Sequence, residues 1–268
     1  MESTKVSFTA KDVMTLRQKT GMGMMDCKKA LAANNGDPKA AEEWLRERVK
    51  GKMEERTERV AGEGRIGIAV DGAKAAMVEV RTETDFTAKN EDFVKMVADV
   101  AGMALSQPAG DVTADDAMST RIDDMRLTTR ENMSLARGCR IDGGSFGKYV
   151  HHDGKRACLL QVEGSVPDDL LKGICQHIVF HDPLGISEDD VPAATLDEIR
   201  AEAIQQAKDT GKNDEIAQKI AEGKVRKYLE ERTLLHQKYV LDESKTVKEL
   251  LPSDAKITRF VRYTLGAD

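Results

Sequence analysis

The stretch GRIGIAVDGAKAAMVEVRT, residues 64–82, decides the fold class because its apolar residues recur with a period of two rather than 3.6. Two such runs flank Asp71-Gly72, a dipeptide typical of tight hairpin turns. The runs are Ile66, Ile68, Val70 and Ala76, Val78, Val80. A helical pattern follows, at Phe93, Met96, Val97, Val100 and Ala104. We therefore predict a β-hairpin packed against a helix, a unit of the α+β class.

The same order recurs in residues 149–181. Strands are predicted at Tyr149 to His152 and Cys158 to Val162, on either side of the turn Asp153-Gly154. A helix follows, with Leu170, Ile174, Ile178 and His181 on one face. When the turns are aligned, the first copy is about five residues longer between strand and helix, within residues 82–90. We expect two related hairpin-plus-helix subdomains, separated by helices at about 114–137.

Three short helices are predicted in the first fifty residues. A capping box at Thr9 and Asp12 starts the first helix, and Asp37-Pro38 caps the third. The second covers about 24–33, with one face formed by Met24, Cys27, Ala30 and Leu31. The charged run at 46–59 is interpreted as a solvated helical linker, with a nucleic-acid-binding arm as the alternative.

The C-terminal half predicts an inserted arm. Residues 192–231 carry two helical apolar stripes around a polar turn, which indicates an antiparallel helical hairpin. Residues 246–251 and 257–263 have strand-like patterns that would complete the second sheet. The expected boundaries are 1–55 for the helical module with its linker, 56–140 for the first core subdomain, 141–191 with 232–268 for the second, and 192–231 for the arm.

Phe86 is the most informative residue of the five-residue insertion. Its neighbours are polar, and none supplies an apolar helical or strand stripe. Two interpretations are open. In one, the ring folds back onto the subdomain core. In the other, it is presented to a partner, since an aromatic ring is the commonest interface anchor.

Composition excludes several classes of function. A net charge of −6 and a pI near 5.6 give no global positive field for nucleic acid or anionic lipid. The four cysteines form no CxxC pair, which favours a reducing compartment. No apolar run predicts a signal peptide or a membrane span, so we expect a cytoplasmic protein. Motifs for phosphate loops, dinucleotides, zinc proteases and serine hydrolases are missing, so we expect neither an enzyme nor a bound cofactor or metal.

Two clusters of side chains have alternative interpretations. His177 and His181 lie four apart on a predicted helix; we interpret them as core or interface histidines, and the alternative is a zinc site of a metal-dependent enzyme. Arg126, Arg130 and Arg137 are helically spaced. A solvated basic face is the simpler interpretation, and contact with an acidic protein or RNA is the other.

Several motifs occur in a fixed order. The longest is LRQKTGMGMMDCKKAL at 16–31, followed by Asn35-Gly36-Asp37. Later matches are Glu83-Thr84-Asp85-Phe86, Glu131-Asn132, Tyr149-Val-His151, Glu215-Ile-Ala217 and Ser244-Lys-Thr-Val247. Together they resemble the elongation factor Ts family from about Val13 to Tyr263. The chain departs from that family's pattern where Thr87 replaces Val, Arg130 replaces Gly, and Lys238-Tyr239 replaces Pro-Phe.

This resemblance implies a guanine-nucleotide exchange factor for elongation factor Tu, with no membrane or direct nucleic-acid partner. It implies that the N-terminal module resembles ubiquitin-associated (UBA) domains and contacts the partner's nucleotide-binding domain through Arg17, Met24 and Met25. Thr84, Asp85 and Phe86 would enter between partner helices near the magnesium and phosphate sites.

The resemblance also assigns roles to the C-terminal half. The second subdomain, with His151, would grip another domain of the partner. The arm would be a coiled coil through which some members dimerise, giving a homodimer or a 2:2 complex. A general protein-binding adaptor that uses the UBA-like module is the alternative function.

Overall fold

The computed structural model describes residues 8–54 and 60–267, and of residues 49–54 the helical backbone alone. Residues 55–59 of the predicted linker lie outside the described residues. The chain divides into two units. Unit 1 contains Met1–Ala69, Ala76–Ile141 and Leu265–Asp268, and unit 2 contains Val70–Ala75 and Asp142–Thr264.

The N-terminal module of unit 1 consists of α1 (Ala10–Thr20), α2 (Met24–Ala33) and α3 (Pro38–Glu54), as the sequence predicts. Thr9 caps α1 in a capping box with Asp12, and Gly21 ends the helix in the left-handed region, at φ 66°. The Asp37 carboxylate accepts hydrogen bonds from the first turn of α3. The module has its own core, formed by Val13, Leu16, Met22, Cys27, Ala30, Leu31, Ala41 and Leu45.

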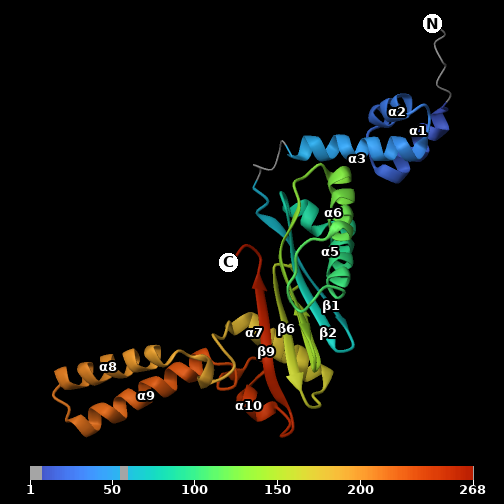
Figure 1. Ribbon diagram of the computed structural model, residues 1–268. Coiled ribbons are helices and arrows are strands. Elements are labelled where there is room, and N and C mark those ends of the chain that lie inside the picture. Colours follow the sequence, from blue (N-terminus) through green and yellow to red (C-terminus); the bar gives the residue numbers. More distant parts are fainter. Residues whose placement is uncertain (1–7, 55–59, 268) are drawn as a thin grey trace. The chain divides into compact units, whose positions relative to one another are not determined.

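The sheet of unit 1 has the strand order β1-β2-β4-β3. The predicted hairpin is β1 (Glu63–Asp71) and β2 (Lys74–Thr82), and α5 (Glu91–Ala104) is the helix predicted after it. The further elements are α4 (Asp85–Lys89), β3 (Gly110–Asp111), α6 (Asp116–Thr129) and β4 (Ser134–Asp142). Figure 1 shows α5 and α6 beside this sheet. Both helices share one core with Ala76, Val78 and Val80 of β2.

One helical prediction in unit 1 is wrong. Helix α6 ends at Thr129, so residues 134–137 of the expected helical region belong to β4. Arg130 has a left-handed backbone, and Arg137 in β4 pairs with the fully buried carboxylate of Glu79 in β2, with 2.8 Å between Nε and Oε2. The three arginines therefore form no common helical face, although their spacing suggests one.

Unit 2 contains the second hairpin and helix. Strands β5 (Ser145–Val150), β6 (Arg156–Glu163) and β9 (Lys256–Thr264) form an antiparallel sheet in that order. Tyr149 faces Cys158 and Leu160 faces Phe260 in the register. Helix α7 (Asp168–His181) packs on β5 and β6 through Leu171, Ile174 and Ile178. The strand predicted at 257–263 completes this sheet, as expected.

The remaining elements of unit 2 include the predicted helical hairpin. A 3₁₀ turn (η1, Glu188–Asp190) precedes α8 (Ala193–Asp209) and α9 (Asp214–Arg232), which lie side by side (Figure 1). Strands β7 (Lys238–Tyr239) and β8 (Asp242–Thr246) form a small second sheet. The strand-like prediction for 246–251 is wrong, because Val247–Leu250 form α10 behind a capping box of Thr246 and Glu249.

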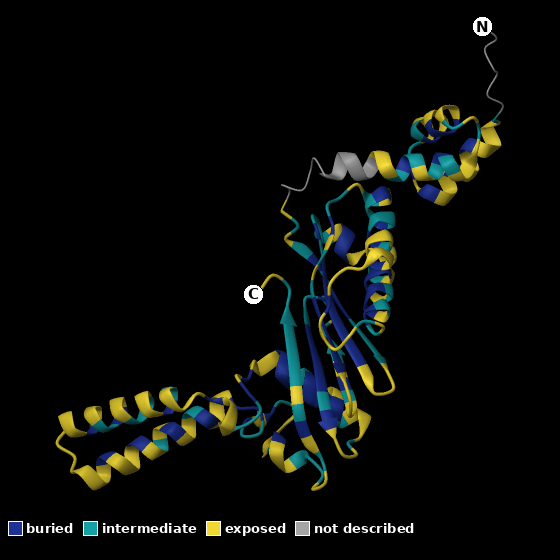
Figure 2. Cartoon of the chain, viewed as in Figure 1, coloured by how far each residue is buried: buried dark blue, intermediate teal, exposed yellow. Residues whose placement is uncertain are grey.

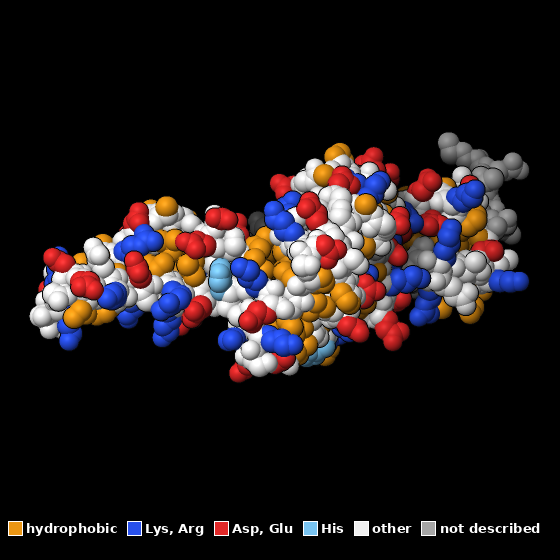
Figure 3. All heavy atoms as spheres, turned by 90° about the horizontal axis from the view of Figure 1, so that it is seen from below, with side chains coloured by type: hydrophobic (Ala, Val, Ile, Leu, Met, Phe, Trp, Pro, Cys, Tyr) orange, Lys and Arg blue, Asp and Glu red, His pale blue; other side chains and the backbone are white. Residues whose placement is uncertain are grey.

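The degree of burial differs between the sheets and the helical hairpin. Strands β2 and β6 are largely buried and β9 is mostly of intermediate exposure, whereas α8 and α9 alternate buried and exposed residues along their length (Figure 2). Lys, Arg, Asp and Glu are interspersed over the face in Figure 3, which agrees with the small net charge. Among the described residues, no helix has the length and apolar character that crossing a bilayer requires.

Candidate functional site

Among the described residues, Phe86 has the most exposed aromatic ring, with 84% of its surface accessible to solvent. It lies in α4, a helix of five residues that the insertion forms. On the same helix, Lys89 donates to Asp85 at 2.7 Å, and this pairing raises the pKa of Lys89. The interpretation in which the ring folds back onto the subdomain core is therefore wrong. Phe86 is presented to solvent.

The opposite side of α4 is held against unit 1. Thr87 and Ala88 are buried, and Ala88 belongs to the core that also contains Phe93. Thr84 is the N-cap of α4, and its hydroxyl oxygen accepts a hydrogen bond from the Thr87 N–H at 3.3 Å. A helix this short gains little from its own hydrogen bonds, so these tertiary contacts determine its position.

Glu131 holds the Thr84 segment from 47 residues further along the chain. Its Oε2 accepts from the Thr82 hydroxyl at 2.7 Å and from the Thr84 N–H at 3.1 Å. Its Oε1 accepts from the hydroxyls of Thr84 and Thr87, at 2.7 and 2.8 Å. We call Glu131 with Thr82, Thr84 and Thr87 the threonine–glutamate clamp. Burial opposes ionisation of Glu131, but these hydrogen bonds outweigh it and hold the pKa of Glu131 below its usual 4.5.

A second hydrogen bond joins the same two segments, and here the carboxylate belongs to the segment before α4. The Glu83 carboxylate accepts a hydrogen bond from the backbone N–H of Asn132 at 2.7 Å. Glu131-Asn132 and Glu83-Thr84 are therefore joined through both glutamates. The sequence offers these two dipeptides as separate motifs, and nothing in their spacing predicts that they meet.

The N-terminal module presents Arg17, Met24 and Met25 around one loop. Arg17 lies in the last turn of α1 and is exposed, and the two methionines begin α2, three residues after Gly21 and its left-handed turn. Met24 is 48% and Met25 63% exposed. The predicted face of α2 is therefore wrong for Met24, whereas Cys27, Ala30 and Leu31 are buried as expected.

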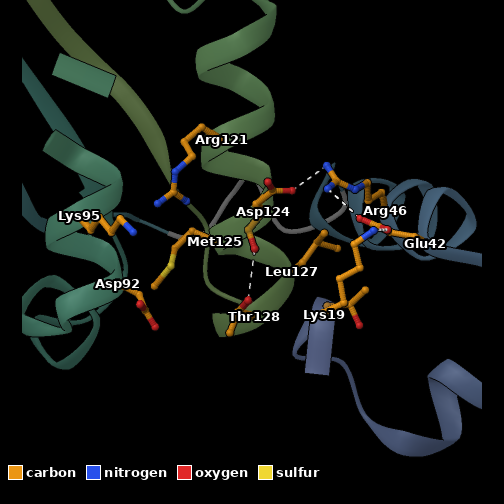
Figure 4. Close-up of a pocket in the computed structure, with 11 residues that line it drawn as sticks. Lys19, Glu42, Arg46, Asp92, Lys95, Arg121, Asp124, Met125, Leu127 and Thr128 are labelled. Atoms are coloured by element: carbon orange, nitrogen blue, oxygen red, sulfur yellow. Dashed lines mark hydrogen bonds and ion pairs between the residues drawn. The ribbon is translucent and has the colours of Figure 1, made fainter. Parts of the chain in front are cut away.

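The module contacts α6 at a charged cavity of about 370 Å³ (Figure 4). Arg46 of α3 pairs with Asp124 of α6 at 2.7 Å and with Glu42 at 3.2 Å. Lys19 pairs with Glu42 at 2.5 Å on the same side of the cavity. Leu127 of α6 is buried in the core of the module. Arg46, predicted as part of a solvated linker, thus anchors the module to α6.

His151, which the resemblance assigns to the second subdomain's partner surface, is half-buried in unit 2. Its Nδ1 lies 2.9 Å from the Tyr149 hydroxyl, and its ring lies 4.2 Å from that of His152, centroid to centroid. The neighbouring Asp153 binds the Lys155 N–H and the Arg156 guanidinium. The contacts with Tyr149 and His152 orient the imidazole of His151 just after the end of β5.

The zinc interpretation of His177 and His181 finds no support in the geometry. His177 is fully buried; its Nε2 lies 2.9 Å from Gln237 Oε1, and its Nδ1 accepts from the Val240 N–H at 3.2 Å. Both ring nitrogens are therefore occupied. His181 is exposed, not part of the apolar stripe as predicted. Within the described residues, no group of three His, Cys, Asp or Glu side chains is arranged to hold a metal ion.

The helical hairpin of unit 2 buries one face and exposes part of the other. Val191, Leu196, Val225 and Leu229 form a core between and beside α8 and α9. Ile216 and Ile220 lie one turn apart on α9 and are 43% and 37% exposed. Within one chain, this pair of isoleucines is only partly covered.

Comparison with known proteins adds to this geometry. The family model described as Elongation factor TS matches residues 83–267, and the model Elongation factor Ts, mitochondrial, N-terminal matches residues 1–52. Elongation factor Ts of Thiobacillus denitrificans is 42% identical, covering 97% of this chain and 92% of the relative. The relatives from Thioalkalivibrio sulfidiphilus and Ruegeria are 39% and 36% identical, each over 97% of this chain and 93% of the relative. This chain belongs to the elongation factor Ts family.

Proposed function

We propose that this protein binds elongation factor Tu in its GDP-bound form and promotes release of GDP and its replacement by GTP. Membership of the elongation factor Ts family implies a nucleotide exchange factor for elongation factor Tu in translation. The observation that carries the mechanism is Phe86, an 84% exposed ring on a helix whose other side is anchored. Such a ring is available to a partner before the partner arrives.

The size of the effect fits one aromatic wedge. An exchange factor lowers nucleotide affinity by binding the nucleotide-free conformation of its partner more tightly. Burial of about 200 Å² of aromatic surface, at about 25 cal/mol per Å², supplies at most about 5 kcal/mol. Inverting a population from 1:99 to 99:1 requires about 5.5 kcal/mol. Phe86 with a few polar contacts therefore reaches the required scale.

Thr84, Asp85 and Phe86 act, in this proposal, between partner helices near the bound magnesium and phosphates. Mg²⁺ requires nearly ideal octahedral geometry, so a small displacement of the partner's backbone weakens its hold on the ion and on GDP. By reciprocity, incoming GTP weakens the binding of the exchange factor. This chain therefore turns over without a chemical step of its own.

The other contacts complete the grip on the partner. Arg17, Met24 and Met25 bind the partner's nucleotide-binding domain, and the second subdomain, with His151, binds another domain. Exposed methionine suits such a surface because its side chain adapts to the shape it meets. The α8–α9 hairpin serves self-association through Ile216 and Ile220, as a coiled-coil arm of a homodimer or 2:2 complex. The complex would operate in the cytoplasm.

The test is release of fluorescent GDP from preloaded elongation factor Tu, followed in a stopped-flow instrument with catalytic amounts of this protein. Wild type should accelerate release, and Phe86→Ala should lose most of that acceleration. Val60→Ala is the control, because Val60 is an 85% exposed apolar side chain that this proposal places in no contact with the partner. Equal release rates with wild type and Phe86→Ala would contradict the wedge mechanism.

A general protein-binding adaptor is the second candidate function. It is favoured by the exposed Met24 and Met25, which lie on a helical module whose core is distinct from that of the sheet. GDP release measured with wild type and with the full-length variant Met24→Ala/Met25→Ala separates the two functions. If the protein is an exchange factor, wild type should accelerate GDP release and this variant should lose most of that acceleration. If the protein is an adaptor, wild type should leave the nucleotide affinity of elongation factor Tu unchanged. The variant should then lose binding to the adaptor's partners.

A further inference from the structure

The exposed position of Phe86 on α4 needs a physical explanation. A helix of five residues is too short to be stable by itself in water. An exposed phenyl ring also lowers its free energy when it folds onto a nearby apolar core. Both effects favour loss of the presented conformation, so specific contacts must oppose them.

The threonine–glutamate clamp supplies those contacts. Glu131 accepts four hydrogen bonds from neutral donors, and three of the donors belong to the segment 84–87. The fourth, Thr82, is the last residue of β2 and is fully buried. One carboxylate therefore joins the end of a core strand to both ends of the turn that carries Phe86. Hydrogen bonds to an ionised acceptor are shorter and stronger than neutral ones.

The clamp also fixes the direction of the Thr84 hydroxyl. That hydroxyl donates its hydrogen to Glu131 Oε1, which leaves its oxygen lone pair free to accept from the Thr87 N–H. Without the carboxylate, the hydroxyl hydrogen is free to rotate toward other acceptors and the cap of α4 weakens. Glu131 thus acts on the first turn of α4 directly and on its capping bond indirectly.

We propose that Glu131 is the positioning residue for Phe86: by holding Thr82, Thr84 and Thr87 it keeps α4 formed and the ring directed into solvent. The inference rests on the proposed exchange function and extends it to a residue that lies outside the insertion. Glu131 does not have to touch the partner. It acts through the conformation of the segment that does.

Glu131→Gln in the full-length protein is the main test. The amide has the size of the carboxylate but replaces one acceptor oxygen by a donor that faces hydroxyl and amide donors. Acceleration of GDP release should fall by about tenfold or more, because a misplaced ring loses part of the differential binding that lowers the partner's affinity for GDP. Glu91→Gln removes an exposed carboxylate from the first turn of α5 and should leave the rate unchanged.

Thr82 provides a second pair of variants in case Glu131→Gln folds poorly. Thr82→Val has nearly the same shape and lacks the hydroxyl that binds Glu131, so it should slow release. Thr82→Ser keeps the donor and should restore most of the rate that Thr82→Val loses. Equal rates for the two variants would contradict a role of this hydroxyl in the clamp.

Combining variants separates positioning from general destabilisation. If Glu131 acts through the ring, Glu131→Gln should add little to the loss already caused by Phe86→Ala. Two independent, multiplying losses would overturn the proposal. A loss with Phe86→Ala but none with Glu131→Gln would overturn it as well, while leaving the exchange function intact. No loss with Phe86→Ala would instead contradict the wedge mechanism.

Accessibility of the ring gives a readout without the partner. In a Trp44→Phe background, Phe86→Trp becomes the one tryptophan of the chain. Its fluorescence should be strongly quenched by acrylamide. Addition of Glu131→Gln should reduce the quenching and shift the emission to the blue, because the ring folds onto the core. Unchanged quenching and emission would overturn the proposal, whatever the exchange rates are.

Discussion

Arg130 and Asp26 connect the end of α6 to the start of α2. Arg130 caps α6 with a left-handed backbone, at φ 61°, and its Nη2 lies 3.7 Å from Oδ2 of Asp26. The family resemblance implies glycine at this position, and glycine adopts this conformation without steric cost. This chain thus combines a strained backbone with a loose ion pair between partly exposed side chains.

Arg130→Gly should therefore stabilise the protein. A non-glycine residue in the left-handed region costs roughly 1–2 kcal/mol, whereas an exposed ion pair contributes less than about 1 kcal/mol. Allowing for the greater freedom of glycine in the unfolded chain, the net gain is about 0.5–1 kcal/mol, or about 1–3 °C in Tm. Differential scanning calorimetry measures this. Arg130→Ala loses the ion pair without relieving the strain, so a Tm above that of wild type would contradict the explanation.

The fold was largely predictable from the sequence because its signals are local. The hairpins, their Asp-Gly turns, the capped helices of the module and the α8–α9 hairpin all have a period or a cap visible within about 20 residues. The errors lie where a local pattern has two meanings. Residues 246–251 look like a strand, but Thr246 and Glu249 form a capping box. The arginine spacing at 126–137 spans a helix end and a strand.

The site was predictable only in part. A ring among polar neighbours and the resemblance to a family both pointed to Phe86. What holds the ring is non-local: Glu131 meets Thr84 across 47 residues, and Arg46 meets Asp124 across the junction of two helical elements. The local pattern of a single sequence does not predict such pairs. The chain has many carboxylates, and its composition does not indicate which of them binds a given threonine or arginine. Met24 shares an apolar stripe with Cys27, Ala30 and Leu31, but at the start of α2 it is exposed.

Leu127→Ala should loosen the N-terminal module from α6. Leu127 is 6% exposed and packs with the core of the module, so truncation removes apolar contact at the junction and costs about 2–3 kcal/mol. Amide hydrogen exchange should then rise in α1–α3 more than in β2 and α5. Leu184→Ala, at a 57% exposed position, is the control and should alter neither. A uniform rise through all of unit 1 would contradict the local effect.

The buried His177 should make stability depend on pH. Burial lowers the pKa of His177 to about 4, and the neighbouring His181 adds to this, against the opposing effect of the hydrogen bond with Gln237. The unfolded chain binds this proton near pH 6.5, before the folded chain does, so stability is complete above that pH and falls as the pH drops toward 4. The slope is at most about 1.4 kcal/mol per pH unit.

Urea unfolding at pH 7, 6 and 5 measures this slope. Protonation of Nδ1 would also break its hydrogen bond with the Val240 N–H. His177→Gln should flatten the dependence between pH 6.5 and 4, although it lowers stability at pH 7. His152→Gln removes an exposed histidine and should retain the wild-type slope. An equal slope in wild type and His177→Gln would assign the pH dependence to other groups.

Gly173 in α7 is required because Tyr239 packs directly over it. A Cβ at position 173 would overlap the Tyr239 hydroxyl and lie 3.1 Å from its ring carbon Cζ. Tyr239 is itself buried, at 7% exposure, so its ring has little room to move. Gly173→Ala should therefore destabilise unit 2 by about 1–3 kcal/mol, even though alanine favours helix. Tyr239→Phe removes the closest atom, so Gly173→Ala should cost less in that background. Additive losses in the double mutant, measured by urea unfolding, would show that this close approach is not the cause.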